Sequence, residues 1–400
     1  MIPTVFRNGL LPLLVLLAGV FCLSPAAPQK GKRGKDICPY CKNDPVLLKR
    51  AGLVSHGPID FGPENGSEGI KERLALSDWL FLETDHMRWA SSLRAETLKG
   101  KDRKRLAPEL ENLRELFPEI PAKVKKLDPY LRLHLMAARG EKFYARFQKL
   151  LGVTDADFAE SRQFDKPYMG NGRFLGEKDK FEVLLHSNRG MHQKFTKEHM
   201  GTVVTDSLRW HFRGQHKMLA SIPAVDADLR NDVSLYPHTV HNLSHLMLCA
   251  YKHFSYDPPT WLDEGLAHVM EHEIDNEFHT LDGEEGSMPD NKGPGDWDLK
   301  LKKLHKRDKV TSFARMIRIQ TFGQMSQEDH VSTNGMVRFL IDEHPDKFAA
   351  FIGAIKGQLN AEGYPDGSDL RGLQRKQLKE LWGLTPNSLD VEFHAWIEAR

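Results

Sequence analysis

His241 and His245 lie four residues apart in the segment YPHTVHNLSHLMLCAYKHF, residues 236–254. On a helix, side chains at this spacing share a face, so both imidazoles can bind one metal ion. The pair alone carries little weight, because 19 histidines among 400 residues produce about one such pair by chance. Glu264 adds the information: 18 residues separate it from His245, within PTWLDEGLAHVMEHE. Two imidazoles and one carboxylate leave one open position on a tetrahedral zinc ion, the arrangement of catalytic zinc.

Two helices have to position these residues. The first is expected from about residue 234 to residue 254 and carries both histidines. SYDPP ends it, and its two prolines suit the start of a second helix with Glu264 in its first turn. Helices joined by a short turn can pack antiparallel, which would return Glu264 to the two histidines.

The segment around Glu264 resembles a family motif. The gluzincin (peptidase-MA-like) metallopeptidases have His-Glu-x-x-His, a spacer and a Glu ligand, and their aminopeptidase branch has a Trp-Leu-x-Glu-Gly-x-Ala segment after the same 18-residue spacer found here. The residues that match this segment are Trp261, Leu262, Glu264, Gly265 and Ala267. More weakly, the chain resembles secreted bacterial peptidase-MA-like proteins of unknown function. The resemblance implies a zincin-like domain with zinc as cofactor and with His241, His245 and Glu264 as its ligands.

Asn242 departs from the family pattern, because it stands where the family has its catalytic glutamate. An asparagine can hydrogen-bond a water molecule but cannot act as a general acid or base. Losing a general base costs roughly 10²–10⁴-fold in rate. Glu271, Asp263 and Glu273 are candidate substitutes, although no motif positions them, and the first two are also candidate hydrogen-bond partners of the ligand histidines. His238 is a candidate base, an extra ligand or a helix cap.

Three functional hypotheses follow from these residues. The favoured one is a zinc-binding, metallopeptidase-like protein that binds a peptide or protein and is a pseudo-peptidase or a very slow hydrolase, because Asn242 replaces the base. The second is an active zinc metallopeptidase with a relocated base. The third is a non-enzymatic scaffold or binding protein whose helices form a core without metal.

Cys38 and Cys41 form a Cys-x-x-Cys pair in DICPYCKNDP. Such a pair is a redox dithiol, a local disulfide or half of a zinc site. No predicted strand precedes it, which argues against a thioredoxin-like motif, and a plain disulfide in an oxidising compartment is favoured. His56 is a weak candidate for a third member of a small metal site, and Cys249 is expected to pack on the first site helix.

Residues 1–27 read as a signal peptide. An apolar run of about 14 residues, LLPLLVLLAGVFCL, precedes the small residues SPAAPQ. The run is shorter than the roughly 20 residues that span a bilayer, so cleavage and a secreted or periplasmic protein are expected, with no membrane segment in the mature chain. With 56 basic and 55 acidic side chains, the charge provides no case for binding nucleic acid.

The remaining pattern predicts an α+β fold that is mainly α. We expect an irregular arm over residues 28–66, a mostly helical region over 67–175 and the zincin-like domain over 176–400. Runs at 180–187 and 216–225 have strand character and predict a small sheet beside the site helices. The segment 281–298, rich in Gly, Pro and Asp, is expected to be a surface loop, and the C-terminal hundred residues are expected to be helical.

Overall fold

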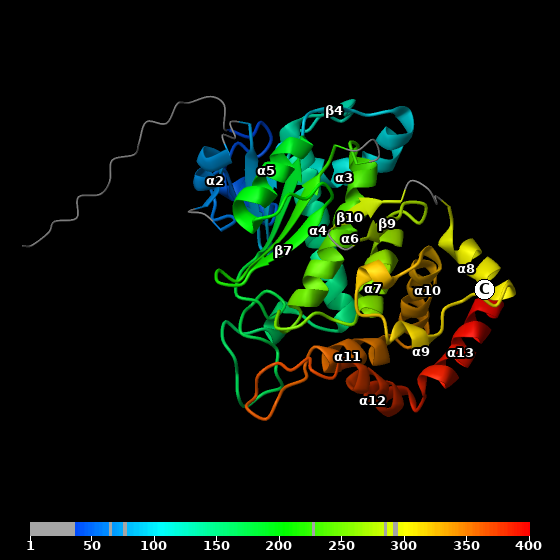
Figure 1. Cartoon of the computed structure of the whole chain (residues 1–400). Coiled ribbons are helices and arrows are strands. Elements are labelled where there is room, and N and C mark those ends of the chain that lie inside the picture. The colour runs from blue at the N-terminus through cyan, green and yellow to red at the C-terminus, as the bar shows by residue number, and fades with distance from the viewer. Residues whose placement is uncertain (1–36, 64–65, 75–77, 226–228, 284–285, 291–294) are drawn as a thin grey trace, which may run out of the picture. The chain divides into compact units, whose positions relative to one another are not determined.

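The computed structural model describes residues 37–63, 66–74, 78–225, 229–283, 286–290 and 295–400. Residues 37–400 belong to one compact unit. The predicted signal peptide, and the predicted arm up to residue 36, lie outside the described residues. The fold is α+β, with more residues in helices than in strands, as the sequence predicts (Figure 1).

A six-stranded sheet in the order β1-β2-β3-β6-β8-β7 forms the frame of the molecule. Its strands are β1 (Leu53–His56), β2 (Leu80–Thr84), β3 (Met87–Ser91), β6 (Phe181–His186), β7 (Leu208–Phe212) and β8 (Lys217–Pro223). β6 pairs in parallel with β3 on one side and with β8 on the other, and the outer pairs are antiparallel. β6 and β8 confirm the two predicted strand runs.

The two faces of the sheet are both covered. Leu82, Trp89 and Val183 belong to the main core, which α4 and α6 share. Phe81 and Leu184, their neighbours on the same strands, point to the other face and join a smaller core with α2 and α5. Figure 1 shows these helices on opposite sides of the sheet. Because side chains alternate along a strand, a sheet covered on both faces needs apolar residues at nearly every position.

Helices supply most of the remaining structure. They are α1 (Pro45–Arg50), α2 (Gly66–Leu74), α3 (Gly100–Leu116), α4 (Pro129–Leu151), α5 (Arg189–Met200), α6 (Asp232–Ala250), α7 (Thr260–His272), α8 (Trp297–Lys306), α9 (Phe313–Met316), α10 (Gln327–Glu343), α11 (Pro345–Ile355), α12 (Leu370–Trp382) and α13 (Pro386–Ala399). The last four confirm the predicted helical C-terminal region. Among the described residues, none of the helices combines the length and the apolar character needed to cross a membrane.

The prediction of a mostly helical region over 67–175 is wrong in part, because residues 80–91 form β2 and β3. These strands hold charged residues that pair within the sheet: Arg88 Nε lies 3.3 Å from Glu83 Oε1. The sheet therefore takes strands from both sides of the boundary predicted at residue 175. Two further pairs of short strands complete the fold: β4 (Glu96–Thr97) with β5 (Lys126–Leu127), and β9 (Thr280–Asp282) with β10 (Ser287–Pro289).

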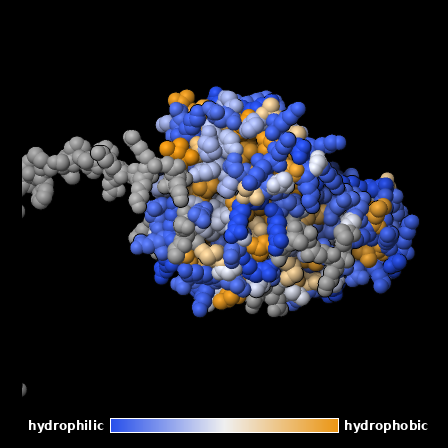
Figure 2. Space-filling model, turned by 90° about the horizontal axis from the view of Figure 1, so that it is seen from above, coloured by the Kyte–Doolittle hydropathy of each residue, from blue (hydrophilic) through white to orange (hydrophobic). Residues whose placement is uncertain are grey.

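The described residues cover most of the face shown in Figure 2 with hydrophilic side chains, and apolar side chains form small patches between them. Among the described residues, buried polar side chains are fewer than buried apolar ones. Glu182, the second residue of β6, is fully buried. Its Oε2 accepts the N–H of Gly62 at 2.8 Å, and Lys217 Nζ lies 3.5 Å from its Oε1.

Burial raises the pKa of Glu182 from 4.5 to about 7, against the opposing effect of Lys217. Between these two pKa values, a carboxyl group with a raised folded-state pKa takes up a proton on folding. Its contribution to the free energy of unfolding is therefore fully present below the unfolded-state pKa of 4.5 and is lost as pH rises through about 7. We expect the free energy of unfolding of wild type to fall over this range, by up to about 3 kcal/mol relative to Glu182→Gln. Urea unfolding at a series of pH values measures this difference, and parallel pH profiles for the two proteins would contradict it.

Candidate metal centre

α6 and α7 carry the predicted ligands and pack against each other as expected. The side chain of Asn231 caps α6 by accepting the N–H of Ser234 at 2.9 Å. Pro259 precedes α7, which continues to His272. A Cβ at Gly265 would lie 2.6 Å from a methyl carbon of Val337, so only glycine lets α7 approach α10 this closely. This close approach also brings a side chain of α10, His330, to the site.

The three predicted ligands converge, and all of them are buried. His241 Nε2 and His245 Nε2 face each other at 3.2 Å. Glu264 Oε2 lies 3.4 Å from His245 Nε2. The antiparallel packing of the two helices therefore places the carboxylate beside the histidine pair, as the sequence predicts.

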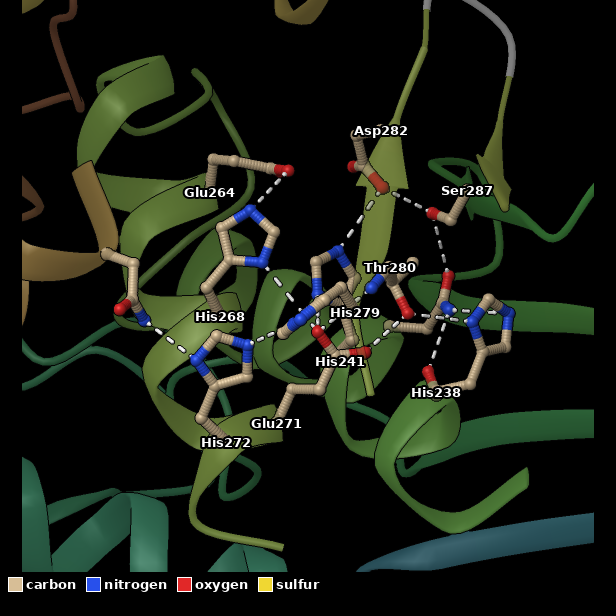
Figure 3. Close-up of polar contacts among 12 residues, drawn as sticks. His238, His241, Glu264, His268, Glu271, His272, His279, Thr280, Asp282 and Ser287 are labelled. Carbon is tan, nitrogen blue, oxygen red and sulfur yellow. Dashed lines mark hydrogen bonds and ion pairs between the residues drawn. The ribbon is translucent and has the colours of Figure 1, made fainter. Parts of the chain in front are cut away.

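Asp282 is a fourth member of this group, and the sequence did not predict it. Its Oδ1 lies 3.3 Å from His241 Nε2, and its Oδ2 lies 3.3 Å from His245 Nε2. Asp282 is the last residue of β9, and Figure 3 shows its carboxylate pointing from that strand toward His241. The four groups can be arranged around one ion, because one ligand atom from each lies within 4.8 Å of every other.

These four residues fit a metal ion by distance and by chemistry. A tetrahedral ion with nitrogen and oxygen ligands at about 2.0–2.1 Å would separate the ligand atoms by about 3.3–3.4 Å. His245 Nε2 lies 3.2, 3.3 and 3.4 Å from the three other ligand atoms. Glu264 Oε2, the carboxylate oxygen that faces His245, has no hydrogen bond of ordinary geometry. A buried oxygen without such a partner is unfavourable, and a metal ion at the centre would supply one.

Asn242 does not point freely into the site. Its Oδ1 accepts a hydrogen bond from Arg209 Nη1 at 3.3 Å and lies 3.3 Å from Ser287 Oγ. Its Nδ2 donates to the carbonyl of His238 at 2.9 Å. The side chain is therefore held by β7, β10 and its own helix.

The structure places two of the suggested substitute bases behind the ligand histidines. Glu271 Oε2 lies 3.6 Å from His241 Nδ1, and Asp263 Oδ1 lies 2.9 Å from His245 Nδ1. Both carboxylates face the ring nitrogen opposite the shared centre. This position orients a histidine ligand and does not suit a group that takes a proton from a reactant. Glu273 lies outside the site in an exposed ion pair with Arg146.

His238 is neither a ligand nor a cap. Ser207 Oγ lies 2.7 Å from its Nε2, and Thr280 Oγ1 lies 3.0 Å from its Nδ1. Burial lowers the pKa of His238 to about 3, so its ring is neutral at physiological pH. His238 therefore joins α6 to β9 and to the start of β7.

Further residues extend the cluster away from the four central groups. His268 Nε2 lies 3.1 Å from Glu264 Oε1, and His330 Nδ1 lies 2.9 Å from the same oxygen (Figure 3 shows His268). Arg209 pairs with Asp282. His268 stands four residues after Glu264 and therefore shares its helix face. This spacing is visible in the sequence and could have indicated that His268 lies beside Glu264. Arg209, Asp282 and His330 belong to no sequence motif. They lie near the centre only because the tertiary fold places β7, β9 and α10 there.

Neighbouring charges in the centre shift the pKa values of its residues. Burial by itself raises the pKa of Asp282, but Arg209, His245 and His241 together outweigh this effect and hold that pKa well below its usual range. Burial by itself lowers the pKa of His241, but the carboxylates of Glu271 and Asp282 raise it to about 10. Without a metal, the His241 ring is therefore protonated at neutral pH. A metal ion must displace that proton, so metal binding weakens as pH falls.

A pocket of about 780 Å³ adjoins the centre, and His245 and Asp263 form part of its wall. β7, an edge strand of the sheet, contributes Trp210 to another wall. Phe322 packs edge-on against the His245 ring, with the ring centroids 5.6 Å apart. The pocket therefore reaches the centre at one ligand, beside an aromatic side chain.

Comparison with protein-family models, with curated proteins and with solved structures found no match. Function therefore has to be inferred from the residues of the site itself.

We expect His241→Ala to lose about one equivalent of bound metal relative to wild type, because it removes one of the four ligands of the group. His238→Gln is the matched control, since it changes a buried histidine one helical turn earlier on α6 and should keep the metal. Metal analysis of both purified proteins by mass spectrometry measures the difference. Equal metal content in wild type and His241→Ala would show that these residues hold no ion.

Proposed function

We propose that this chain is an exported, zincin-like protein that binds zinc through His241, His245 and Glu264 and does not hydrolyse peptides at an ordinary rate. The three residues, their spacing and the resemblance of their motif support zinc over other metals. Export is supported by the predicted signal peptide alone. The function that we propose is binding of a peptide or protein segment in the pocket beside the centre.

The position of Asp282 is the observation that carries this proposal. A catalytic zinc has three protein ligands and one position for water or substrate, whereas a structural zinc has four protein ligands. Asp282 approaches both histidine Nε2 atoms to 3.3 Å, which is the place of a fourth ligand. Ser287 Oγ donates to Asp282, and Arg209 pairs with it, so the carboxylate is held in place from two sides. A centre closed in this way stabilises the fold and leaves no room for a reacting water.

A relocated general base is the main alternative, and Asp282 is the carboxylate closest to the position required. Its environment argues against this role. A general base works best when its pKa lies near the working pH. Burial raises the pKa of Asp282, but Arg209 and the two histidines together hold it well below its usual range, so Asp282 is a weak proton acceptor. Asn242 has no titratable proton to offer.

The pocket supports a peptide as the ligand. It combines the aromatic side chains Trp210, Phe254 and Phe322 with polar groups such as Arg371 and Gln374. Pockets with apolar walls and a few polar groups are typical of ligand sites. β7 adjoins the pocket and pairs with β8 along one edge. A bridge between Ser207 and Ser287 lies on its other edge, just before the strand, so an extended peptide would add backbone hydrogen bonds beyond that bridge, along residues 210–212.

We expect wild type to show no peptidase activity on a peptide library, and Asn242→Glu alone to add little, because Asp282 still closes the centre. The double variant Asn242→Glu, Asp282→Ala restores a base and opens one position. Its turnover should exceed that of Asp282→Ala by roughly 10²–10⁴-fold, the contribution of a general base. Metal analysis on each variant verifies that the ion is retained.

Glu273→Gln is the control for this series, since it removes a carboxylate from the end of α7 outside the centre and should change nothing. Two results would overturn the proposal. The first is wild-type cleavage that chelation and Glu264→Ala abolish. The second is a loss of such cleavage in Asp282→Asn, which would identify Asp282 as the base.

Ile319 lines the pocket, and Ile319→Glu would place a charge on its wall. We expect this change to weaken binding of library peptides by at least about tenfold, because a charge loses hydration when a ligand covers it. Val391→Glu is the matched control, because Val391 is an exposed apolar residue on α13, outside the pocket lining. Fluorescence polarisation with labelled peptides measures both, and equal affinities would exclude this pocket as the binding site.

A further inference from the structure

A second group of metal-binding side chains lies in the N-terminal part of the described chain. Cys38 and Cys41 come from the turn before α1, His56 from the end of β1 and His134 from α4. All four side chains are buried, and one ligand atom from each lies within 4.8 Å of every other. Cys38 Sγ and His134 Nε2 are 3.2 Å apart.

We propose that Cys38, Cys41, His56 and His134 bind a second zinc ion in a closed structural site. Two thiolates and two imidazoles are a donor set typical of structural zinc, and the Cys-x-x-Cys spacing is that of half such a site. Zn–S and Zn–N bonds of about 2.3 and 2.0 Å would separate a sulfur and a nitrogen ligand by about 3.5 Å. The 3.2 Å contact between Cys38 and His134 is close to that value. No position remains for water, so the site has no catalytic role.

His56 provides an observation independent of the sulfur atoms. Only 7% of the residue is exposed, and its Nε2 has no hydrogen-bond partner among the described residues. A buried ring nitrogen without a partner is unfavourable, because it has lost its hydrogen bond to water. A metal ion bound to this nitrogen and to the other three residues would supply the missing partner.

The turn that carries Cys38 and Cys41 has a backbone conformation that suits two cysteine ligands of one metal ion. Lys42 and Asn43 have φ angles of 52° and 54°, a left-handed conformation that non-glycine residues rarely adopt. It turns the chain sharply after Cys41, and the N–H of Lys42 bonds to the carbonyl of Cys38 at 2.9 Å. The side chain of Asn43 then donates to the carbonyl of His56 at 2.9 Å. The same turn therefore shapes the sulfur pair and positions the first histidine.

The disulfide favoured from the sequence is not present, because Cys38 and Cys41 are free thiols. A disulfide would use both sulfur atoms and would leave the buried His56 nitrogen without a partner. The presence of His134 near Cys38 was not predictable, since the two residues are 96 positions apart in the chain. The arrangement of four donors, rather than two, favours zinc over the disulfide.

The site would fasten the N-terminal segment to α4. The cysteines belong to a small apolar core with Leu106, Phe117 and Leu131, separate from the main core. The His134 ring packs against Phe117 with centroids 4.8 Å apart. A zinc ion at this position would join the turn, β1 and α4 and would stabilise a core that is small on its own.

The test uses cobalt in the full chain, because a cobalt ion bound by thiolate absorbs in the near ultraviolet by sulfur-to-metal charge transfer. We expect this band in wild type reconstituted with Co²⁺ and in His241→Ala, since the other centre contains no sulfur. The double variant Cys38→Ser, Cys41→Ser should lose the band, because a single remaining thiolate can still bind cobalt, and His134→Gln should lose about one equivalent of zinc. Cys249→Ser is the control and should keep both, because Cys249 lies on α6 outside the group.

The band belongs to the wild-type protein, so the result does not depend on whether a variant folds. Its absence from wild type purified with a reductant, or its persistence in a folded Cys38→Ser, Cys41→Ser protein, would overturn the proposal. A Cys38–Cys41 disulfide detected by mass spectrometry in protein isolated without reductant, with no zinc at the site, would also overturn it. Failure of the proposed peptidase-like function would leave this band unchanged, so the two proposals are tested separately.

Discussion

The burial of several carboxylates in one small volume is the constraint on which the centre depends. Glu264, Glu271 and Asp282 have no exposed side-chain surface. A buried charge whose partner is removed destabilises a protein by about 3–5 kcal/mol, so each carboxylate requires cationic or hydrogen-bonding neighbours. Those neighbours come from different elements: the histidines from α6, α7 and α10, Arg209 from β7 and Thr280 from β9. The need to neutralise these buried carboxylates therefore fixes the relative positions of five elements, α6, α7, α10, β7 and β9.

α4 connects this centre with the N-terminal group. Arg132 of α4 pairs with Asp232 at the start of α6 at 2.7 Å, and both side chains are almost fully buried. Arg139, two turns later, donates to the backbone carbonyl of Asp232 at 2.9 Å. His134 lies between these two arginines in the sequence. One helix thus contacts the start of the ligand-bearing helix and also carries a member of the second group.

The parts of the fold that could be predicted were those with a strong local pattern. α6, α7, β6 and β8 have long apolar stretches or recognisable ends, and the motif around Glu264 identified one ligand without any contact information. β2 and β3 were missed because they contain Glu83 and Arg88, whose charges are neutralised across the sheet rather than by exposure. Asp282 was missed for a different reason. Its place beside the histidines depends on the pairing of β9 with β10 and on a bridge between Ser207 and Ser287, which no local pattern reveals.

The order of the strands has a consequence for how the chain folds. β3 pairs in parallel with β6, and β6 with β8, so residues 87–91 find their partners only at 181–186 and the sheet continues through 217–223. Non-local pairing of this kind folds slowly, because long loops must close before any contact forms. While a chain is being synthesised, β1, β2 and β3 can form no more than a meander with an unpaired edge, which is prone to aggregation. The N-terminal strands therefore stay incompletely paired until residues 181–186 are available, and the sheet is completed late.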